Sequence, residues 1–303
     1  MDLLLLIFAN NIAPILLSAG AGFAIGRAFN LDVKAASRLV FYIFSPCLVF
    51  VSLTETTLSV TDFGRMTIFA VSTVILFGVA AFAFGKLLNL NRPTLAALVV
   101  TNMFGNGGNY GLSLTLFAFG GVALAWATVY YTITALMVNT LGVIIASSGR
   151  VSLRESIGGI FKLPMLYGMI LAILFRALNI EVPVAFFRAI KLLSGAALPV
   201  MLIVLGLQLA QIKRIDNIRL VSAASVFQLL CGPIIGLLLA SLLGLSGAAR
   251  QAAIIEASMP TAVVVTILGI EYDINPDFIT GVVLLTTLLS PLTLTPLIAF
   301  LYL

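Results

Sequence analysis

Glycine and asparagine interrupt an otherwise apolar part of the chain at residues 101–111, which hold four glycines and three asparagines. In a helix each glycine costs up to about 1 kcal/mol relative to alanine, and asparagine competes for backbone hydrogen bonds. Unwound backbone is tolerated inside a membrane where it is buried or lines a water-filled cavity, and there its carbonyls and half-helix N-termini can bind ions. The segment therefore predicts a broken helix with a polar binding site, rather than the close helix packing that isolated glycines serve.

A second break is predicted at Pro260, in the sequence Glu256-Ala-Ser-Met-Pro-Thr261. Proline removes a backbone donor and clashes with the preceding turn, while Ser258 and Thr261 can satisfy the groups that are set free. Glu256 is the only acidic residue that we place well inside a membrane span, which makes it a candidate proton or cation site. A structural salt bridge to Arg250 explains a buried glutamate equally well, so both interpretations stay open.

The two segments supply the candidate site residues. The predicted substrate-binding residues are Asn106, Gly107, Gly108, Asn109, Tyr110, Met259, Pro260 and Thr261, and the candidate coupling-ion residues are Glu256, Asn102 and Ser258. Four amides are expected to make interhelical hydrogen bonds more readily than ligand contacts: Asn102, Asn139, Gln208 and Gln228. With no histidine and two cysteines, the chain lacks the usual ligands for zinc, haem and iron-sulfur clusters, and no catalytic residue or metal site is predicted. No cofactor is expected, apart from coupling to Na⁺ or H⁺.

Hydrophobic residues make up 61% of the chain and charged residues only 9%, whereas charged residues form about 25% of a water-soluble domain. This composition excludes soluble enzymes, nucleic-acid binders and secreted disulfide scaffolds, because none could keep so much apolar surface away from water. The formal net charge of +5 does not imply a polyanionic partner, since basic residues beside membrane spans record orientation in the bilayer. The chain is therefore predicted to be an integral membrane protein that binds no nucleic acid.

Ten apolar blocks are long enough to cross the bilayer as helices, given a hydrocarbon core of about 30 Å and a rise of about 1.5 Å per residue. They lie near residues 3–26, 36–53, 63–88, 94–118, 121–146, 161–178, 184–210, 219–245, 250–269 and 277–302. With both termini outside, eleven of the sixteen basic residues fall in cytoplasmic connections: Arg27, Lys34, Arg38, Lys86, Arg92, Arg150, Arg154, Lys162, Lys213, Arg214 and Arg219. This excess favours that orientation by the positive-inside rule.

The two halves of the chain carry similar sequence. Residues 27–33, Arg-Ala-Phe-Asn-Leu-Asp-Val, return as Arg-Ala-Leu-Asn-Ile-Glu-Val at residues 176–182, and Pro46 lies 61 residues before Gly107 as Pro199 lies 61 residues before Pro260. Five spans per copy is an odd number, so the second copy must enter the membrane upside down, as in many secondary transporters. The predicted units are a first repeat at 1–146, a cytoplasmic linker at 147–160 and an inverted second repeat at 161–303, with breaks in spans 4 and 9.

Several motifs together resemble the auxin efflux carrier family. They are Gly105–Gly111 followed by Phe117–Gly120, then Leu198–Leu202, Leu205–Leu209, Glu256–Ala262 and Thr286–Ser290, and they extend over nearly the whole chain. The family often has proline two residues after the glycine that matches Gly111, whereas this chain has Ser113, a departure that bears on the shape of the crossover.

The resemblance implies a ten-helix carrier with two crossed broken helices, similar in fold to sodium/bile acid symporters, that moves small organic anions such as carboxylates, dicarboxylates or auxin-like molecules. It implies that spans 1, 2, 6 and 7 form a scaffold that also makes a homodimer contact, and that spans 3–5 and 8–10 form a mobile transport unit. Amide and hydroxyl donors with two half-helix N-termini could then receive a carboxylate without a buried arginine.

The main hypothesis is therefore a secondary transporter of the plasma (inner) membrane that works by alternating access of the elevator type. A sodium-coupled symporter of the bile acid type is the nearest alternative, and a channel with a polar pore ranks well behind it. An intramembrane enzyme would need catalytic groups that the sequence does not contain in a recognisable pattern.

Overall fold

The computed structural model describes the chain except for residues 1, 30, 57, 149–150 and 213–216. Asn30, Arg150, Lys213 and Arg214, which enter the sequence analysis, lie outside the described residues. Helices contain 84% of the residues, and the described part of the chain has no strand, only an isolated bridge between Gly105 and Thr261. The prediction of an all-α membrane protein is confirmed.

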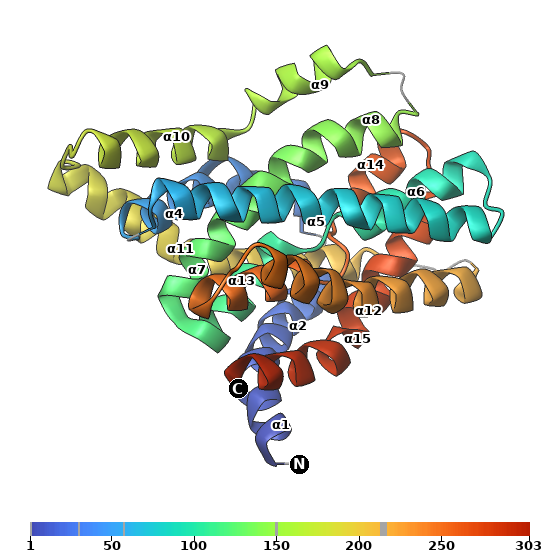
Figure 1. Cartoon of the computed structure of the whole chain (residues 1–303). Helices are drawn as coiled ribbons and strands as arrows, with labels where there is room; N and C mark the ends of the chain where they lie inside the picture. Colours follow the sequence, from blue (N-terminus) through green and yellow to red (C-terminus); the bar gives the residue numbers. More distant parts are fainter. Residues whose placement is uncertain (1, 30, 57, 149–150, 213–216) are drawn as a thin grey trace.

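Figure 1 shows the helices, and those of the first half include short π-helical turns, which are written η here. They are α1 (Asp2–Ile7), η1 (Phe8–Ile12), α2 (Ala13–Ala28), α3 (Val33–Leu39), η2 (Val40–Phe44), α4 (Ser45–Thr54), α5 (Val60–Leu87), α6 (Arg92–Met103), η3 (Gly107–Gly111), α7 (Leu112–Met137), η4 (Val138–Gly142) and α8 (Val143–Ala146). Polar side chains cap the N-termini of α5 and α6. Ser59 and Asn91 accept hydrogen bonds from backbone N–H groups in the first turns of these helices, which fixes where the helices begin.

The second half begins with a short amphipathic helix, α9 (Leu153–Ile160), at the edge of the molecule opposite α1 and the end of α15 (Figure 1). It continues with α10 (Pro164–Ala177), α11 (Val184–Ala210), α12 (Ile218–Leu242), α13 (Gly247–Ala257), α14 (Val265–Glu271) and α15 (Pro276–Tyr302).

By length and composition, the described residues contain seven helices able to cross a membrane, or eight if the bent pair α9 and α10 counts as one span. This number is below the ten predicted spans, because breaks and bends divide or join several of the predicted helices. α6, α13 and α14 have 12, 11 and 7 residues because helix breaks divide the predicted spans 4 and 9. The apolar run Gly107–Ala146 joins parts of spans 4 and 5 and is interrupted at Gly120, whose φ of +79° only glycine adopts readily.

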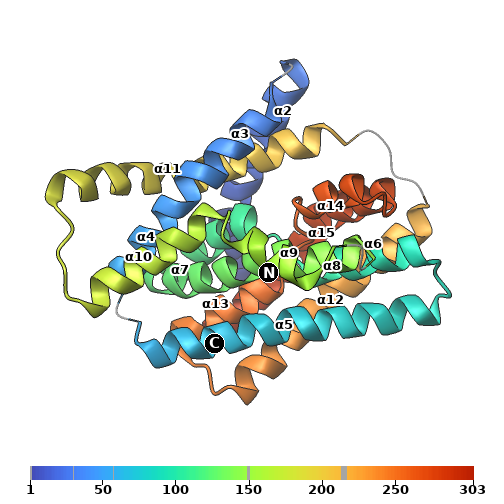
Figure 2. The same ribbon diagram turned by 90° about the horizontal axis from the view of Figure 1, so that it is seen from above.

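The helices fall into two groups in the view of Figure 2. α2, α3, α4, α10 and α11 gather on one side, α5, α6, α12, α14 and α15 lie on the other, and α7 and α13 run between them. Within the first group α2 packs mainly on α11 and α10 mainly on α4, while α13 packs on α7 and α12 on α15. The two helix breaks therefore lie in the middle of the molecule.

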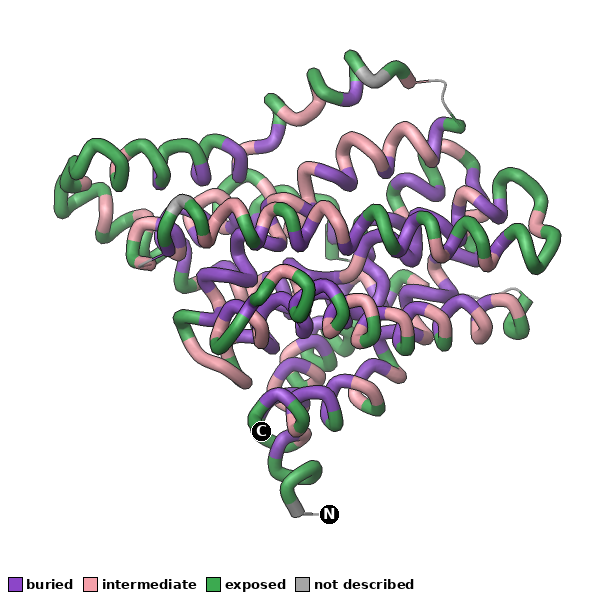
Figure 3. Tube along the Cα trace, viewed as in Figure 1, coloured by how far each residue is buried: buried purple, intermediate pink, exposed green. Residues whose placement is uncertain are grey.

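Burial follows this arrangement, with buried backbone in the centre and exposed positions on the outer helices (Figure 3). Many large apolar side chains are exposed, for example Leu17, Leu192 and Leu242, each more than 70% accessible. Such a surface suits lipid rather than water. Buried polar side chains, in contrast, collect around the breaks, and these are described next.

Candidate functional site

The first break separates α6 from η3. Phe104 has extended backbone with φ −120° and ψ +103°, Asn106 is also non-helical, and the helix resumes at Gly107 as a π-helical turn that leads into α7. Asparagine and glycine are the residues that most readily leave the helical conformation, so the local sequence accounts for the interruption. The predicted break in residues 101–111 is thus present.

The second break lies between α13 and α14. α13 ends at Ala257, and the chain is not α-helical again until Val265. Pro260 cannot donate a backbone hydrogen bond, and the Ser258 hydroxyl donates to the carbonyl of Ile254 at 2.6 Å. The predicted break at Pro260 is therefore also present.

The two breaks touch through their backbones. The Asn106 N–H donates to the Pro260 carbonyl at 2.7 Å, the Ala262 N–H donates to the Phe104 carbonyl at 2.8 Å, and Gly105 and Thr261 form an antiparallel bridge. A Cβ atom on Gly105 would lie 3.2 Å from the Cβ atom of Met259, so glycine allows this close approach. Backbone groups freed by one break are satisfied by the other, as membrane-buried backbone requires.

Glu256 from α13 lies against the π-helical turn of the other half. A Cβ atom on Gly107 would lie 2.5 Å from its Oε2 atom, and one on Gly111 would lie 2.7 Å from Oε1 and 2.8 Å from Oε2. Two glycines four residues apart thus make space for the carboxyl group. We call Gly107, Gly111 and the carboxyl group of Glu256 the glycine cradle.

The surroundings of the cradle are polar but offer no basic side chain. Glu256 is 1% exposed, and no described group hydrogen-bonds to either of its carboxyl oxygens. Thr115 faces the carboxyl without completing a hydrogen bond, and Tyr130 and Tyr131 of α7 lie close by. The salt bridge to Arg250 is not formed, because the only ion pair among the described residues joins Lys191 to Glu55, and the Arg250 guanidinium lies over the Phe300 ring, 5.7 Å from its centre.

Buried polar atoms without a hydrogen-bonding partner are concentrated at this place. Of eleven such side-chain atoms in the described part of the chain, eight belong to the breaks or to helices that adjoin them: Asn102 Oδ1, Asn106 Nδ2, Ser113 Oγ, Thr115 Oγ1, Gln228 Oε1, Glu256 Oε1 and Oε2, and Thr261 Oγ1. Each unpaired buried polar group costs about 1–3 kcal/mol, so a cluster of them is typical of a site that binds something polar.

The other predicted site residues lie beside the same crossing. Tyr110 is fully buried and its phenol accepts a hydrogen bond from Ser290, while Asn109 is half-buried. The Met259 carbonyl accepts from Gln228, and the Thr261 N–H donates to the Thr286 hydroxyl at 3.2 Å. The structure brings the predicted residues together, and their roles toward a ligand or an ion stay predictions.

Several residues at the site were not among the predicted ones, namely Thr115, Thr286 and Ser290, together with Tyr130 and Tyr131. Threonine and serine are common in membrane helices, where their hydroxyls bond to their own backbone, so their type alone gave no signal. Thr286 and Ser290 do begin and end one of the motifs that carry the family resemblance, which could have marked them.

Of the four amides for which interhelical hydrogen bonds were predicted, two form them and two do not. Gln228 bonds from α12 to Met259, and Gln208 bonds from α11 to Ser37 on α3 at 3.4 Å, so the interhelical prediction is confirmed for these two. It is wrong for Asn102 and Asn139, whose side chains donate to Leu98 and Ala135 of their own helices. An amide that can reach the carbonyl four residues back needs no neighbouring helix.

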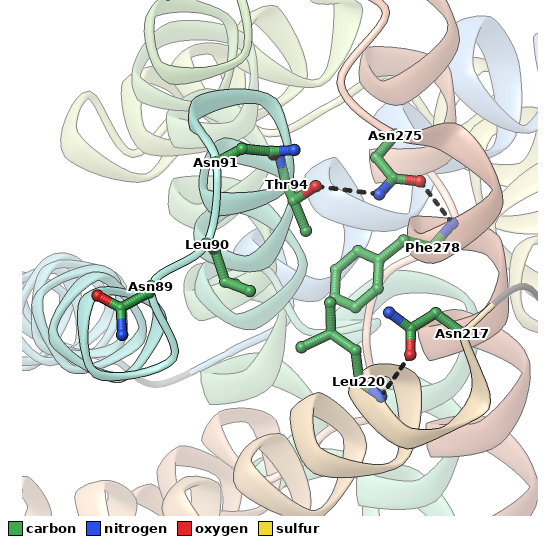
Figure 4. Close-up of a pocket in the computed structure, with 8 residues that line it drawn as sticks. All are labelled: Asn89, Leu90, Asn91, Thr94, Asn217, Leu220, Asn275 and Phe278. Carbon is green, nitrogen blue, oxygen red and sulfur yellow. Dashed lines mark hydrogen bonds between the residues drawn. The ribbon is translucent and has the colours of Figure 1, made fainter.

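Surface pockets lie away from the crossing. One of about 350 Å³ lies where α6, α12 and α15 begin, and it is lined by the three asparagines that cap these helices, Asn91, Asn217 and Asn275 (Figure 4). Asn275 donates to Thr94 at 3.2 Å across this cavity. None of the predicted site residues lines it, so it is distinct from the crossing.

The described residues include no group of three His, Cys, Asp or Glu side chains arranged to hold a metal ion.

Comparison with known proteins finds similarity over most of the chain. A family model described as membrane transport protein matches residues 7–157 and 147–298. An uncharacterised transporter of Methanothermobacter thermautotrophicus is 28% identical over 87% of this chain and 87% of its own length, and one of Methanocaldococcus jannaschii is 24% identical over 86% and 87%. Auxin efflux carrier component 1 of Arabidopsis thaliana is 32% identical over 43% of this chain and 21% of its own length.

These matches agree with an all-helical membrane protein whose two central helix breaks meet. The family model covers both breaks, and the archaeal relatives align over most of their own length. The chain is a membrane transport protein of the auxin efflux carrier family.

Proposed function

We propose that this transporter carries a small organic anion, a carboxylate of the dicarboxylate or auxin-like kind, by alternating access. The observation that carries the proposal is the meeting of the two breaks, where Asn106 Nδ2 and Thr261 Oγ1 are buried without partners. An amide donor and a hydroxyl donor on adjoining backbone suit a carboxylate. Both residues are at most 4% exposed, so substrate access requires a change of conformation.

The first break supplies more of the anion site than the second. The helix that starts at Gly107 leads into α7. The Gly107 N–H donates to Gly105, but the N–H groups of Gly108 and Asn109 have no partner among the described contacts, which favours an anion at that end. α14 has only seven residues, and the N–H groups of Val265 and Thr266 already donate to Ala262 and Val263. The anion is therefore bound mainly at the N-terminus that begins at Gly107, with Thr261 on the opposite side.

We propose that the chain contains ten spans in two inverted repeats, and the matching arginines of residues 27–33 and 176–182 support this. Arg27, after predicted span 1, donates to the Ile212 carbonyl beyond the end of α11. Arg176, after predicted span 6, donates to the Leu53 carbonyl in the last turn of α4 and to the Leu58 carbonyl in the connection to α5. Each arginine thus binds carbonyls at or just beyond the C-terminal end of the second span of the opposite repeat, an equivalence that an inverted duplication accounts for.

Arg176→Ala is expected to lower the thermal unfolding midpoint by about 2 °C, because two hydrogen bonds to backbone carbonyls are lost and the side chain is exposed to solvent. Arg188→Ala, which removes an exposed arginine from α11, is the matched control and should leave the midpoint unchanged. Thermal unfolding in detergent measures both. Equal midpoints for the two variants would remove Arg176 from the contacts that hold the repeats together.

The proposed mechanism is of the elevator type, in which spans 3–5 and 8–10 move against a scaffold of spans 1, 2, 6 and 7. The grouping of α2, α4, α10 and α11 on one side of the molecule supports this division. The scaffold would also form a homodimer, and both termini would lie outside the cytoplasm of the plasma (inner) membrane. The similarity to auxin efflux carrier component 1 supports a carboxylate as substrate.

Flux of radiolabelled succinate and indole-3-acetate into proteoliposomes tests the proposed function. Asn106→Ala should reduce saturable exchange about tenfold or more, since one lost hydrogen bond to a charged group is worth about 1.5–3 kcal/mol. Pro260→Ala should reduce it by a similar factor, because alanine restores a backbone donor and lets the helix continue through the second break. Asn139→Ala is the control, because Asn139 bonds only to its own helix among the described contacts. Absence of exchange with the unmodified protein for both probes would contradict the proposal, and discrete ionic currents would indicate a channel instead.

A further inference from the structure

We propose that Glu256 carries a proton that binds together with the substrate anion, so that the carrier couples anion and proton movement. The inference rests on the proposed function and names the coupling ion of the same site. It is based on the glycine cradle, in which the carboxyl group of one half of the chain is enclosed by the π-helical turn of the other half.

The groups that face Glu256 favour a neutral carboxyl in this conformation. The only ion pair among the described residues joins Lys191 to Glu55, far along the chain from α13. A buried ionised carboxylate costs several kcal/mol unless it is paired and hydrogen-bonded, and here neither oxygen has a partner. A proton removes the charge without any rearrangement of the surrounding helices.

Titratable side chains on the helices around α13 do not supply a cation at this depth. Tyr110 of η3 and Tyr130 and Tyr131 of α7 are phenols, and Tyr130 and Tyr131 are the ones beside the carboxyl. α12 carries one thiol within its length, that of Cys231, which is half-buried. The remaining such groups of α5, α12 and α15 lie near helix ends: Asp62, Arg65, Lys86, Arg219, Asp277 and Tyr302.

The tight fit of the cradle favours a proton over a metal cation. The carboxyl oxygens lie against the backbone of Gly107 and Gly111, where even a methyl group would approach them to 2.5–2.8 Å. A metal cation requires several oxygen ligands arranged around it, whereas a proton occupies no additional volume. The Ser258 hydroxyl, one of the candidate coupling-ion residues, also directs its hydrogen to Ile254 in its own helix.

Coupling to the anion follows from the shared backbone. Asn106, which we place on the substrate, directly precedes Gly107 of the cradle, so the bound anion and an ionised Glu256 would repel each other in a medium of low dielectric constant. Protonation of Glu256 therefore strengthens anion binding, and by linkage the anion strengthens proton binding by the same factor. Anion affinity is highest at low pH and falls as the pH rises and the carboxyl loses its proton.

The test compares unmodified protein, Glu256→Gln and Glu181→Gln in proteoliposomes with labelled succinate and indole-3-acetate. Glu181 is an exposed acid between α10 and α11 and serves as the matched control. An inward proton gradient should drive accumulation of the labelled anion by the unmodified protein and by the control. Glu256→Gln should accumulate about tenfold less, or lower still. Because the neutral amide imitates the protonated carboxyl, the anion affinity of Glu256→Gln should depend on pH only through the ionisation of the probe itself, whereas that of the unmodified protein and of Glu181→Gln should fall further as the pH rises.

Three results would overturn the proposal: proton-driven accumulation by Glu256→Gln at the unmodified level, an unchanged pH dependence of its affinity, or accumulation driven by a sodium gradient and lost in Glu256→Gln. If that variant does not fold, a pH-indicator dye in weakly buffered solution can follow proton uptake when the unmodified protein binds either probe, at a pH high enough for its anion affinity to have begun to fall. Uptake of a proton on binding supports the proposal, and binding without uptake contradicts it. Failure of the proposed function would give a different result, because the unmodified protein would then exchange neither probe.

Discussion

Gly111→Ala is expected to abolish most transport, with a loss of about a hundredfold, because its new methyl group collides with the carboxyl group of Glu256. The Cβ atom would lie 2.7 Å from Oε1, 2.8 Å from Oε2 and 2.9 Å from Cδ. The carboxyl ends a flexible side chain but is buried, so it can leave this position only by pushing against the groups packed around it, and a shift of about 1 Å in a positioned site can cost a hundredfold in rate. Exchange of labelled succinate and indole-3-acetate measures the loss.

Stability should respond less than transport. One added methyl group in a packed interior costs about 1–3 kcal/mol, from which up to about 1 kcal/mol is recovered because alanine favours the helix. The matched control is Gly121→Ala on α7, where no atom lies within 4 Å of the new Cβ. It should keep its transport activity.

The double variant Gly111→Ala with Glu256→Ala identifies the colliding group. Once the carboxyl is removed, Gly111→Ala should no longer lower the unfolding midpoint relative to Glu256→Ala alone, a non-additive result of the kind that contacting residues give. Additive effects on the midpoint would show that Gly111 is constrained by something other than Glu256, and the description of the cradle would be wrong.

The breaks themselves could be predicted from sequence because their causes are local. Residues 101–111 hold four glycines and three asparagines, and Pro260 lacks a backbone donor, so each segment resists the helical conformation whatever surrounds it. The crossing of the two broken helices was implied by the family resemblance, and the contact of Asn106 with Pro260 agrees with it.

The partner of each polar group could not be predicted, because it depends on tertiary packing. From the sequence, a salt bridge to Arg250 and a functional site were equally good interpretations of Glu256. Nothing in the sequence connected Glu256 with Gly107 and Gly111, which the structure places against its carboxyl group. Glycines spaced by four residues are common in packed membrane helices, where they usually face another backbone. Only the path of α13 across η3 distinguishes a cradle for a carboxyl group from an ordinary helix contact.

Hydropathy alone also could not predict how many helices are long enough to span the membrane. A window of apolar residues does not register that Phe104 and Ser258 end a helix or that Gly120 bends one, since these residues change the backbone without changing the mean hydropathy. The same breaks that create the site therefore shorten the helices that would otherwise count as spans.

Gly206→Ala is expected to have the largest effect on folding, because the methyl group would enter the backbone of α2. Its nearest neighbours would be the carbonyl oxygen of Ala19, the nitrogen of Phe23 at 2.6 Å and the carbonyl carbon of Ala19 at 2.8 Å. Backbone atoms cannot rotate away as side chains can, so α2 and α11 must separate along their whole contact. The expected cost is about 3 kcal/mol or more, at the upper end for overpacked interiors.

The control for Gly206→Ala is Gly195→Ala, eleven positions earlier on α11, where no atom lies within 4 Å of the new Cβ. Both variants gain the same helix propensity, so the difference between them isolates the contact of α11 with α2. The yield of monodisperse protein in detergent and its unfolding midpoint should fall sharply for Gly206→Ala alone. Equal yields and midpoints would mean that α2 and α11 tolerate separation, and the two helices could not then form the rigid part of a scaffold against which the glycine cradle moves.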